Sequence, residues 1–131
     1  MNSFRAAGYV RTESSSDLPS LEEQRSTIER YARESGYKLV ATYEDIEAPG
    51  HLLYHKPALK EAINNIKELE EWEVLVVADP RCISETKSAL HEFVHKLSLY
   101  GNRLESPEKS WDELLEEMRE YRSAMQQRRI P

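Results

Sequence analysis

The stretch YVRTESSSDLPSLEEQ, residues 9–24, is typical of the end of a β-strand, the loop that follows it and the start of a helix. Apolar residues lead into it, so we expect a short strand at residues 5–11. Ser20 and Glu23 match the S-x-x-E capping box, which predicts that a helix begins there. The loop at residues 12–19 is polar, and it follows the carboxyl end of a strand, where α/β proteins bind their ligands.

The remaining chain continues the alternation of strands and helices. The expected strands are residues 5–11, 37–43, 74–78 and 102–105, and the expected helices are residues 21–35, 57–69, a helix ending near Gly101, and residues 111–126. The run VLVVA, residues 74–78, is apolar throughout, as in strands buried at the centre of a parallel sheet. This order predicts an α/β fold: a three-layer αβα domain with a mostly parallel sheet of four or five strands, plus a C-terminal helix. We expect residues 1–105 to form the domain and residues 106–131 the added helix.

Composition narrows the class of protein. At 131 residues the chain is long enough for one domain with its own core. Its net charge of −6 does not suit a stand-alone nucleic-acid binder, because such binding depends on neutralising phosphates. No apolar stretch approaches the roughly 20 residues of a membrane span, and no secretory signal is visible, so we expect a cytoplasmic protein without a membrane partner. A single cysteine, Cys82, excludes an intrachain disulfide and agrees with a reducing compartment.

Charged side chains follow the first three strands. These loops are residues 11–17, 44–50 and 79–84. Because the carboxyl ends of parallel strands meet at one edge of a sheet, the loops are expected to converge. There, Arg11, Lys56 and Arg81 could form a triangle of cations suited to a phosphate. The alternative is that they are solvated loop charges, paired with nearby acids: Asp45, Glu47 and Asp79.

Four short motifs occur in an order that resembles a known family. They are YVRTESSSDLPSLEEQ, YEDIEAPG, HKPALKEAI and VLVVADPRCIS. Together they resemble the N-terminal catalytic domain of resolvase/invertase-type serine site-specific recombinases, over roughly residues 5–105. In that family a serine cuts DNA and forms a 5′-phosphoserine link, arginines hold the scissile phosphate, and strands are exchanged within a tetramer. The resemblance implies DNA recombination without a cofactor or a metal.

Several positions of the family's site are matched in this sequence. Tyr9 and Arg11 match the first motif, Asp45 the second, and Arg81 the first arginine of the third loop. The resemblance implies that the arginines bind phosphate and that Tyr9 and Asp45 support them. Lys56 stands where an arginine is usual, which keeps the charge but loses the bidentate fork.

Other positions depart from the family pattern. Glu13 stands at the position of the nucleophilic serine, and Ser14 is one residue late. Neighbouring side chains on an extended backbone point to opposite faces, so Ser14 does not simply replace it. The remaining departures are Asp17, Pro49, Pro80 and Ser84, the last at the position of the second arginine. We therefore predict a retained fold with a degenerate, catalytically impaired site. The alternative is an active recombinase that uses Ser14 or Ser15 after a shift of the loop.

The C-terminal helix suggests partners. In the family the corresponding helix pairs subunits, so the resemblance implies a homo-oligomer or an assembly with an active relative. Packing back on its own domain is the alternative. No separate DNA-binding domain is expected within the 131 residues. DNA binding through the helix alone would be weak and salt-sensitive, because glutamates interleave its arginines: Arg119, Arg122, Arg128 and Arg129.

A competing motif is HEFVH, residues 91–95, which fits the H-E-x-x-H pattern of zinc peptidases. Glu113 and Glu117 are the candidates for a third ligand. Helical geometry places His91 and His95 well away from the expected buried stripe, which favours two solvated histidines. Cys82 also has two interpretations: a thiol with a lowered pKa beside Arg81, or a side chain packed under the following helix.

Overall fold

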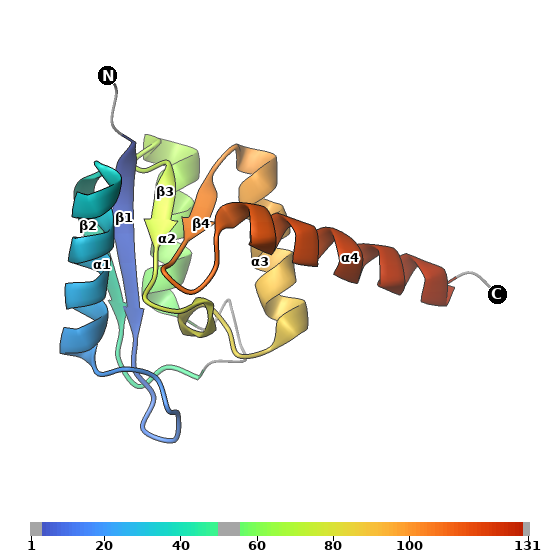
Figure 1. The fold of residues 1–131 in the computed structure, drawn as a ribbon, viewed down its shortest axis with the longest axis horizontal. Helices are drawn as coiled ribbons and strands as arrows, with labels where there is room; N and C mark the ends of the chain where they lie inside the picture. The colour runs from blue at the N-terminus through green and yellow to red at the C-terminus, as the bar shows by residue number, and fades with distance from the viewer. Residues whose placement is uncertain (1–3, 50–55, 130–131) are drawn as a thin grey trace.

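The computed structural model of the protein describes residues 4–49 and 56–129. Within them, four strands form one parallel sheet in the order β2-β1-β3-β4 (Figure 1). The strands are β1 (Arg5–Arg11), β2 (Lys38–Asp45), β3 (Val74–Val76) and β4 (Arg103–Glu105). The predicted parallel sheet is confirmed, and its central strands β1 and β3 are buried along almost their whole length.

Helices cover both faces of the sheet, as the prediction of three layers requires. They are α1 (Leu21–Ser35), α2 (Pro57–Leu69), α3 (Lys87–Tyr100) and α4 (Trp111–Arg129), with a short 3-10 helix, η2 (Pro80–Cys82). Side chains alternate across β1: Ala6 and Val10 pack with α1 through Ile28, whereas Ala7 and Tyr9 face the cluster that α2 and α3 complete. Figure 1 shows α1 on one side of the sheet and α2 and α3 on the other.

The ends of the helices follow signals that are visible in the sequence. The Ser20 hydroxyl accepts a hydrogen bond from the backbone N–H of Glu23 at 3.2 Å, as in a capping box. Gly36 ends α1 with φ 73°, a conformation that costs little without a Cβ. Pro57 lies in the first turn of α2, where its missing N–H has no cost. These local contacts fix where α1 and α2 begin and where α1 ends.

Some boundaries differ from the predictions. β3 ends at Val76, two residues earlier than expected, although Val77 and Ala78 stay buried. The backbone N–H of Val77 still donates a hydrogen bond to the carbonyl of Glu105. The buried segment is therefore longer than the strand itself. The last helix continues to Arg129 instead of ending near residue 126.

The helix α4 has two unlike halves. Leu114 and Met118 belong to the same hydrophobic cluster as the sheet, so the first half packs on its own domain, as one of the two alternatives predicted. The second half projects beyond the sheet (Figure 1). None of its described side chains, residues 119–127, is fully buried. Among the helices in the described residues, none has the length and apolar composition needed to cross a membrane.

Candidate functional site

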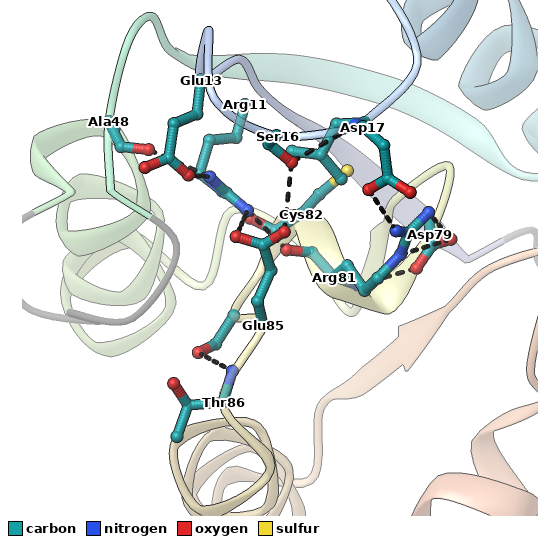
Figure 2. A network of polar contacts seen from close by, with 12 residues as sticks. Arg11, Glu13, Ser16, Asp17, Ala48, Asp79, Arg81, Cys82, Glu85 and Thr86 are labelled. Carbon is teal, nitrogen blue, oxygen red and sulfur yellow. Dashed lines mark hydrogen bonds and ion pairs between the residues drawn. The ribbon is translucent and has the colours of Figure 1, made fainter.

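The carboxyl edge of the sheet brings the first and third loops together, as predicted. Arg11 is the last residue of β1 and Arg81 lies in η2, after β3. Arg11 Nη2 donates a hydrogen bond to the backbone carbonyl of Arg81 at 2.7 Å. The two arginines, 70 positions apart in the sequence, are therefore neighbours in the fold (Figure 2).

Arg11 is wholly enclosed, with 0% of its surface exposed. Its Nε donates to the carbonyl of Cys82 at 2.9 Å, and its Nη1 donates to the carbonyl of Ala48 at 3.0 Å. With the bond to Arg81, backbone carbonyls from two loops hold all three guanidinium nitrogens. A buried arginine with this many partners has a fixed orientation. Arg11 is thus no solvated loop charge, contrary to the alternative considered for the three cations.

Two carboxylates contact the terminal nitrogens of the Arg11 guanidinium in addition to the backbone carbonyls. Glu13 Oε2 accepts from Arg11 Nη1 at 3.1 Å, and Glu85 Oε2 lies 3.7 Å from Arg11 Nη2. Glu85 also accepts a hydrogen bond from the hydroxyl of Ser16 at 3.1 Å, which ties the first loop to the third. Figure 2 shows Glu13 and Glu85 reaching the guanidinium from these two loops. Carboxylates from the first and third loops therefore contact both terminal nitrogens of the Arg11 guanidinium.

Arg81 belongs to a second, more open set of ion pairs. Its Nη2 contacts Asp79 Oδ2 at 3.1 Å, and its Nη1 donates to Asp17 Oδ1 at 2.7 Å. The predicted alternative, in which a loop cation pairs with Asp79, is correct for this residue. Ser84, which the resemblance put at the position of the family's second arginine, is buried, and its hydroxyl accepts a hydrogen bond from the backbone N–H of Thr86. It shapes the turn before α3.

The serines of the first loop do not meet Arg11. Ser14 and Ser15 are exposed. The backbone N–H of Ser14 donates to Glu47 Oε2 at 3.0 Å, which holds that residue toward the second loop. Of the neighbouring residues Glu13 and Ser14, it is Glu13 whose side chain points to the guanidinium. Alternation of side chains along an extended chain predicts this difference.

Lys56 lies in the same cluster and is fully buried. Burial, and to a lesser extent the charge of Arg11, lower the pKa of its ammonium to about 8. Asp45, Glu13 and Glu85 oppose the shift by attracting the proton. The sequence placed Lys56 near the expected phosphate site but gave no sign of its burial. Gly50, which precedes Lys56 in the sequence, lies outside the described residues.

The lowered pKa of Lys56 predicts how stability depends on pH. Its pKa is about 8 in the fold and 10.5 without it, so between these values the unfolded chain binds more protons. Stability therefore rises with pH across this window. We expect the wild type to gain about 2 kcal/mol there relative to Lys56→Met, measured by urea unfolding. Parallel pH curves for the two proteins would contradict the assignment.

Tyr9 and Asp45 form the support of the second loop. The Tyr9 hydroxyl donates to Asp45 Oδ2 at 2.7 Å, and the carboxylate also accepts the backbone N–H groups of Ala58 and Leu59 at 2.9 and 3.1 Å. Asp45 thereby caps α2, whose own N-cap residue, Lys56, makes no side-chain cap. Burial, with the bond to Asp45, raises the pKa of Tyr9 far above its usual range, so the hydroxyl keeps its proton.

Gln24 is a positioning residue that the sequence reasoning missed. It is fully buried, its Oε1 accepts the backbone N–H of Arg11 at 3.0 Å, and its Nε2 donates to the Arg11 carbonyl at 2.8 Å. The side-chain amide thus bonds the backbone of Arg11 from both sides. A signal was present: Gln24 is a polar residue on the stripe that Leu21 and Ile28 define on α1. Glu85 was missed as well, and it has no comparable signal.

The zinc motif has a different structure from the one expected. His91 is buried, 7% exposed, because Tyr121 of α4 stacks on its ring with centroids 4.9 Å apart. The expectation of a solvated His91 is therefore wrong; burial under α4 also lowers its pKa. His95 Nδ1 lies 3.4 Å from Arg122 Nη1. In the described part of the chain, no three metal-ligating side chains are grouped to hold an ion.

Cys82 packs inside the domain. It is fully buried, and its Sγ lies 3.4 Å from Gln24 Oε1. Burial raises the pKa of the thiol to about 11. The interpretation as a reactive thiol with a lowered pKa is wrong, because the desolvation of the thiolate outweighs the attraction of Arg11 and Arg81.

Four parallel strands with helices on both faces, and an arginine-centred polar cluster at the carboxyl edge of the sheet, define a three-layer α/β domain. The family model described as the resolvase N-terminal domain matches residues 6–130. The chain therefore belongs to this family, and it is a resolvase-like serine recombinase domain related to site-specific recombination. Among curated proteins, none matches the sequence significantly.

Solved structures share the fold. The N-terminal catalytic domain of TP901-1 integrase is similar with a TM-score of 0.72 and 22% identity, over 81% of this chain and 78% of that one. The C-terminal catalytic domain of ISC1926 TnpA, an IS607-like serine recombinase, gives 0.67 and 23%, over 92% and 82%. A resolvase family site-specific recombinase from Streptococcus pneumoniae gives 0.66 and 17%, over 97% and 91%.

Proposed function

We propose that this recombinase domain does not cleave DNA and acts by associating with another copy of itself or with an active relative. The observation that supports this is the Glu13 carboxylate, bonded to Arg11 at 3.1 Å from the position where the family carries its nucleophile. A carboxylate there offers no hydroxyl for a phosphoserine link. It also repels the phosphate that Arg11 would otherwise attract.

The expected loss of rate is large. Removing the nucleophile of a cooperative site has cost about 10⁶ in kcat, and removing one preorganised donor about 10²–10³. Here Ser84 replaces an arginine as well, and its hydroxyl is engaged with Thr86. For the Ser14 hydroxyl to reach Arg11, the hydrogen bond from the Ser14 N–H to Glu47 would have to break. Glu13 would also have to give up its contact with the guanidinium.

Covalent capture tests the loss of cleavage. The protein is incubated with DNA from the genome that encodes it, so that its own recombination site is present, and complexes that survive SDS are measured. We expect wild type and Ser14→Ala to give the same background, while an active serine recombinase on its own site gives a clear signal. A wild-type adduct that disappears in Ser14→Ala would show that the chain is an active enzyme and overturn the proposal.

The outer half of α4 supports association. Tyr121 and Met125 are only half-buried, and they line a groove of about 290 Å³ between α3 and α4. Tyr121 already stacks on His91 of α3, but it and Met125 keep part of their apolar surface exposed, and such surface on an amphipathic helix is suited to packing against a partner. We propose that a second copy, or a related recombinase domain, covers this part of the helix.

A charge placed in this surface should disrupt the assembly. We expect Met125→Glu to raise the dissociation constant at least about tenfold, because a carboxylate would be buried without a partner. Gln127→Glu adds the same charge at an exposed position and is the control. Light scattering across a concentration series measures both. A wild type that stays monomeric at every concentration, with or without a related domain, would contradict association through α4.

A further inference from the structure

The cluster around Arg11 has the composition of an occupied anion site. A guanidinium has five N–H groups. Carbonyls take three of them, one on each nitrogen, which leaves one N–H on Nη1 and one on Nη2. Glu13 accepts from the first, and Glu85 is the acid nearest the second. A phosphate or sulfate would offer its oxygens to the same two groups.

The two acids also lie between the guanidinium and solvent. The Arg11 side chain is 0% exposed, whereas those of Glu13 and Glu85 are 23% and 37% exposed. They come from the first and third loops, and Ser16 joins these loops by its bond to Glu85. Figure 2 shows both carboxylates directed at the guanidinium. The acids thus form the rim of the site and occupy its contact with Arg11.

Glu13 and Glu85 also balance the positive charge that is buried at this site. Arg11 and Lys56 are both fully buried cations that repel each other. Buried charges are tolerated only when they are paired. Glu13 and Glu85 provide two negative charges to this pair, together with Asp45 on the Lys56 side. Without Glu13 and Glu85, the buried cations would outnumber the nearby acids.

We propose that Glu13 and Glu85 are a built-in substitute for an oxyanion, and that removing both charges turns the Arg11 cluster into a binding site for a tetrahedral anion of the phosphate or sulfate type. This inference rests on the proposed function, since a site that its own carboxylates fill does not hold a DNA phosphate. Beyond that function, Glu85 acts with Glu13 as a second carboxylate that occupies the site. The Arg11 cluster without these two charges binds a phosphate-type or sulfate-type anion.

Anion-dependent stability tests the proposal. The melting temperature of Glu13→Gln/Glu85→Gln is measured in chloride, inorganic sulfate and inorganic phosphate at equal ionic strength. We expect the double variant to melt lower than wild type in chloride and to regain about 3–6 °C in millimolar sulfate or phosphate, by mass action on the folded state. Wild type should respond to the three salts alike.

A matched variant removes the same charge elsewhere. Glu44→Gln/Glu47→Gln takes two acids from the same edge: Glu44 pairs with Arg25, and Glu47 accepts from the Ser14 backbone. It should show no preference for sulfate over chloride. A comparable preference in this control or in wild type would show an adventitious ion only, and it would overturn the inference.

The single variants Glu13→Gln and Glu85→Gln decide the matter if the double variant does not fold. Each should show a smaller sulfate-specific gain, and no gain in either overturns the inference. A short DNA duplex added to the double variant distinguishes a phosphodiester from a free anion, because Arg11 is enclosed and we expect only the free anion to reach it. Stabilisation by the duplex but not by sulfate would refute the proposed ligand class. These results are independent of covalent capture, which tests the proposed function alone.

Discussion

Replacing Arg11 by methionine is expected to lower the free energy of unfolding by about 3–5 kcal/mol, because a buried charge network loses its centre. The variant leaves the carbonyls of Ala48, Arg81 and Cys82 without their donor. It also leaves Glu13 beside an apolar side chain, without its partner. Arg11→Lys should recover little of this loss, since one ammonium does not reach carbonyls on three sides.

Urea unfolding, with its midpoint and slope, measures this effect. Arg25→Met is the control, because Arg25 pairs with Glu44 on the surface of the domain and exposed pairs contribute little. A loss for Arg11→Met no larger than that of Arg25→Met would show that the contacts of Arg11 do not stabilise the fold. The expected result would also give Arg11 a structural role: it holds the second and third loops together.

Asp45→Ala is expected to cost about 2–4 kcal/mol of stability, the second largest effect. The carboxylate accepts the Tyr9 hydroxyl and the N–H groups of Ala58 and Leu59, and only 5% of the residue is exposed. Alanine removes all three acceptor contacts. The start of α2 then has no side-chain cap, since Lys56 provides none.

Tyr9→Phe separates the two roles of Asp45. It removes one of the three hydrogen bonds and keeps the cap on α2. We expect a loss of about 1 kcal/mol, measured by the same unfolding experiment. A loss for Tyr9→Phe equal to that of Asp45→Ala would mean that the hydroxyl contact, and not the helix cap, carries the energy.

Features set by neighbouring residues were predictable from the sequence. The capping box at Ser20, the stop at Gly36 and the first-turn proline at Pro57 all act within one turn of helix. The alternation of strands and helices then led to the parallel sheet, and the sheet to the convergence of Arg11 and Arg81. Glu13 facing the arginine followed from alternation along an extended chain.

Features set by tertiary packing were not predictable in this way. Helical geometry put His91 on the polar side of α3, and it is buried only because α4 lies across that side and brings Tyr121 onto its ring. The burial of Lys56 and the pairing of Glu85 with Arg11 depend on where loops settle after the strands are paired. Gln24 is the intermediate case, since its place on an apolar stripe was visible but its bonds to Arg11 were not.

Because the protein's own groups hold the Arg11 guanidinium, we expect that no phosphate reaches it. Arginine side-chain NMR of the wild type tests this directly, by following the N–H protons of Arg11 while inorganic phosphate is added. We predict slow exchange with water, since these protons are bonded and buried, and no change in their resonances up to tens of millimolar phosphate. Saturable shifts of the Arg11 resonances, with those of Arg25 unmoved, would show a phosphate site that is open in the wild type and contradict this expectation.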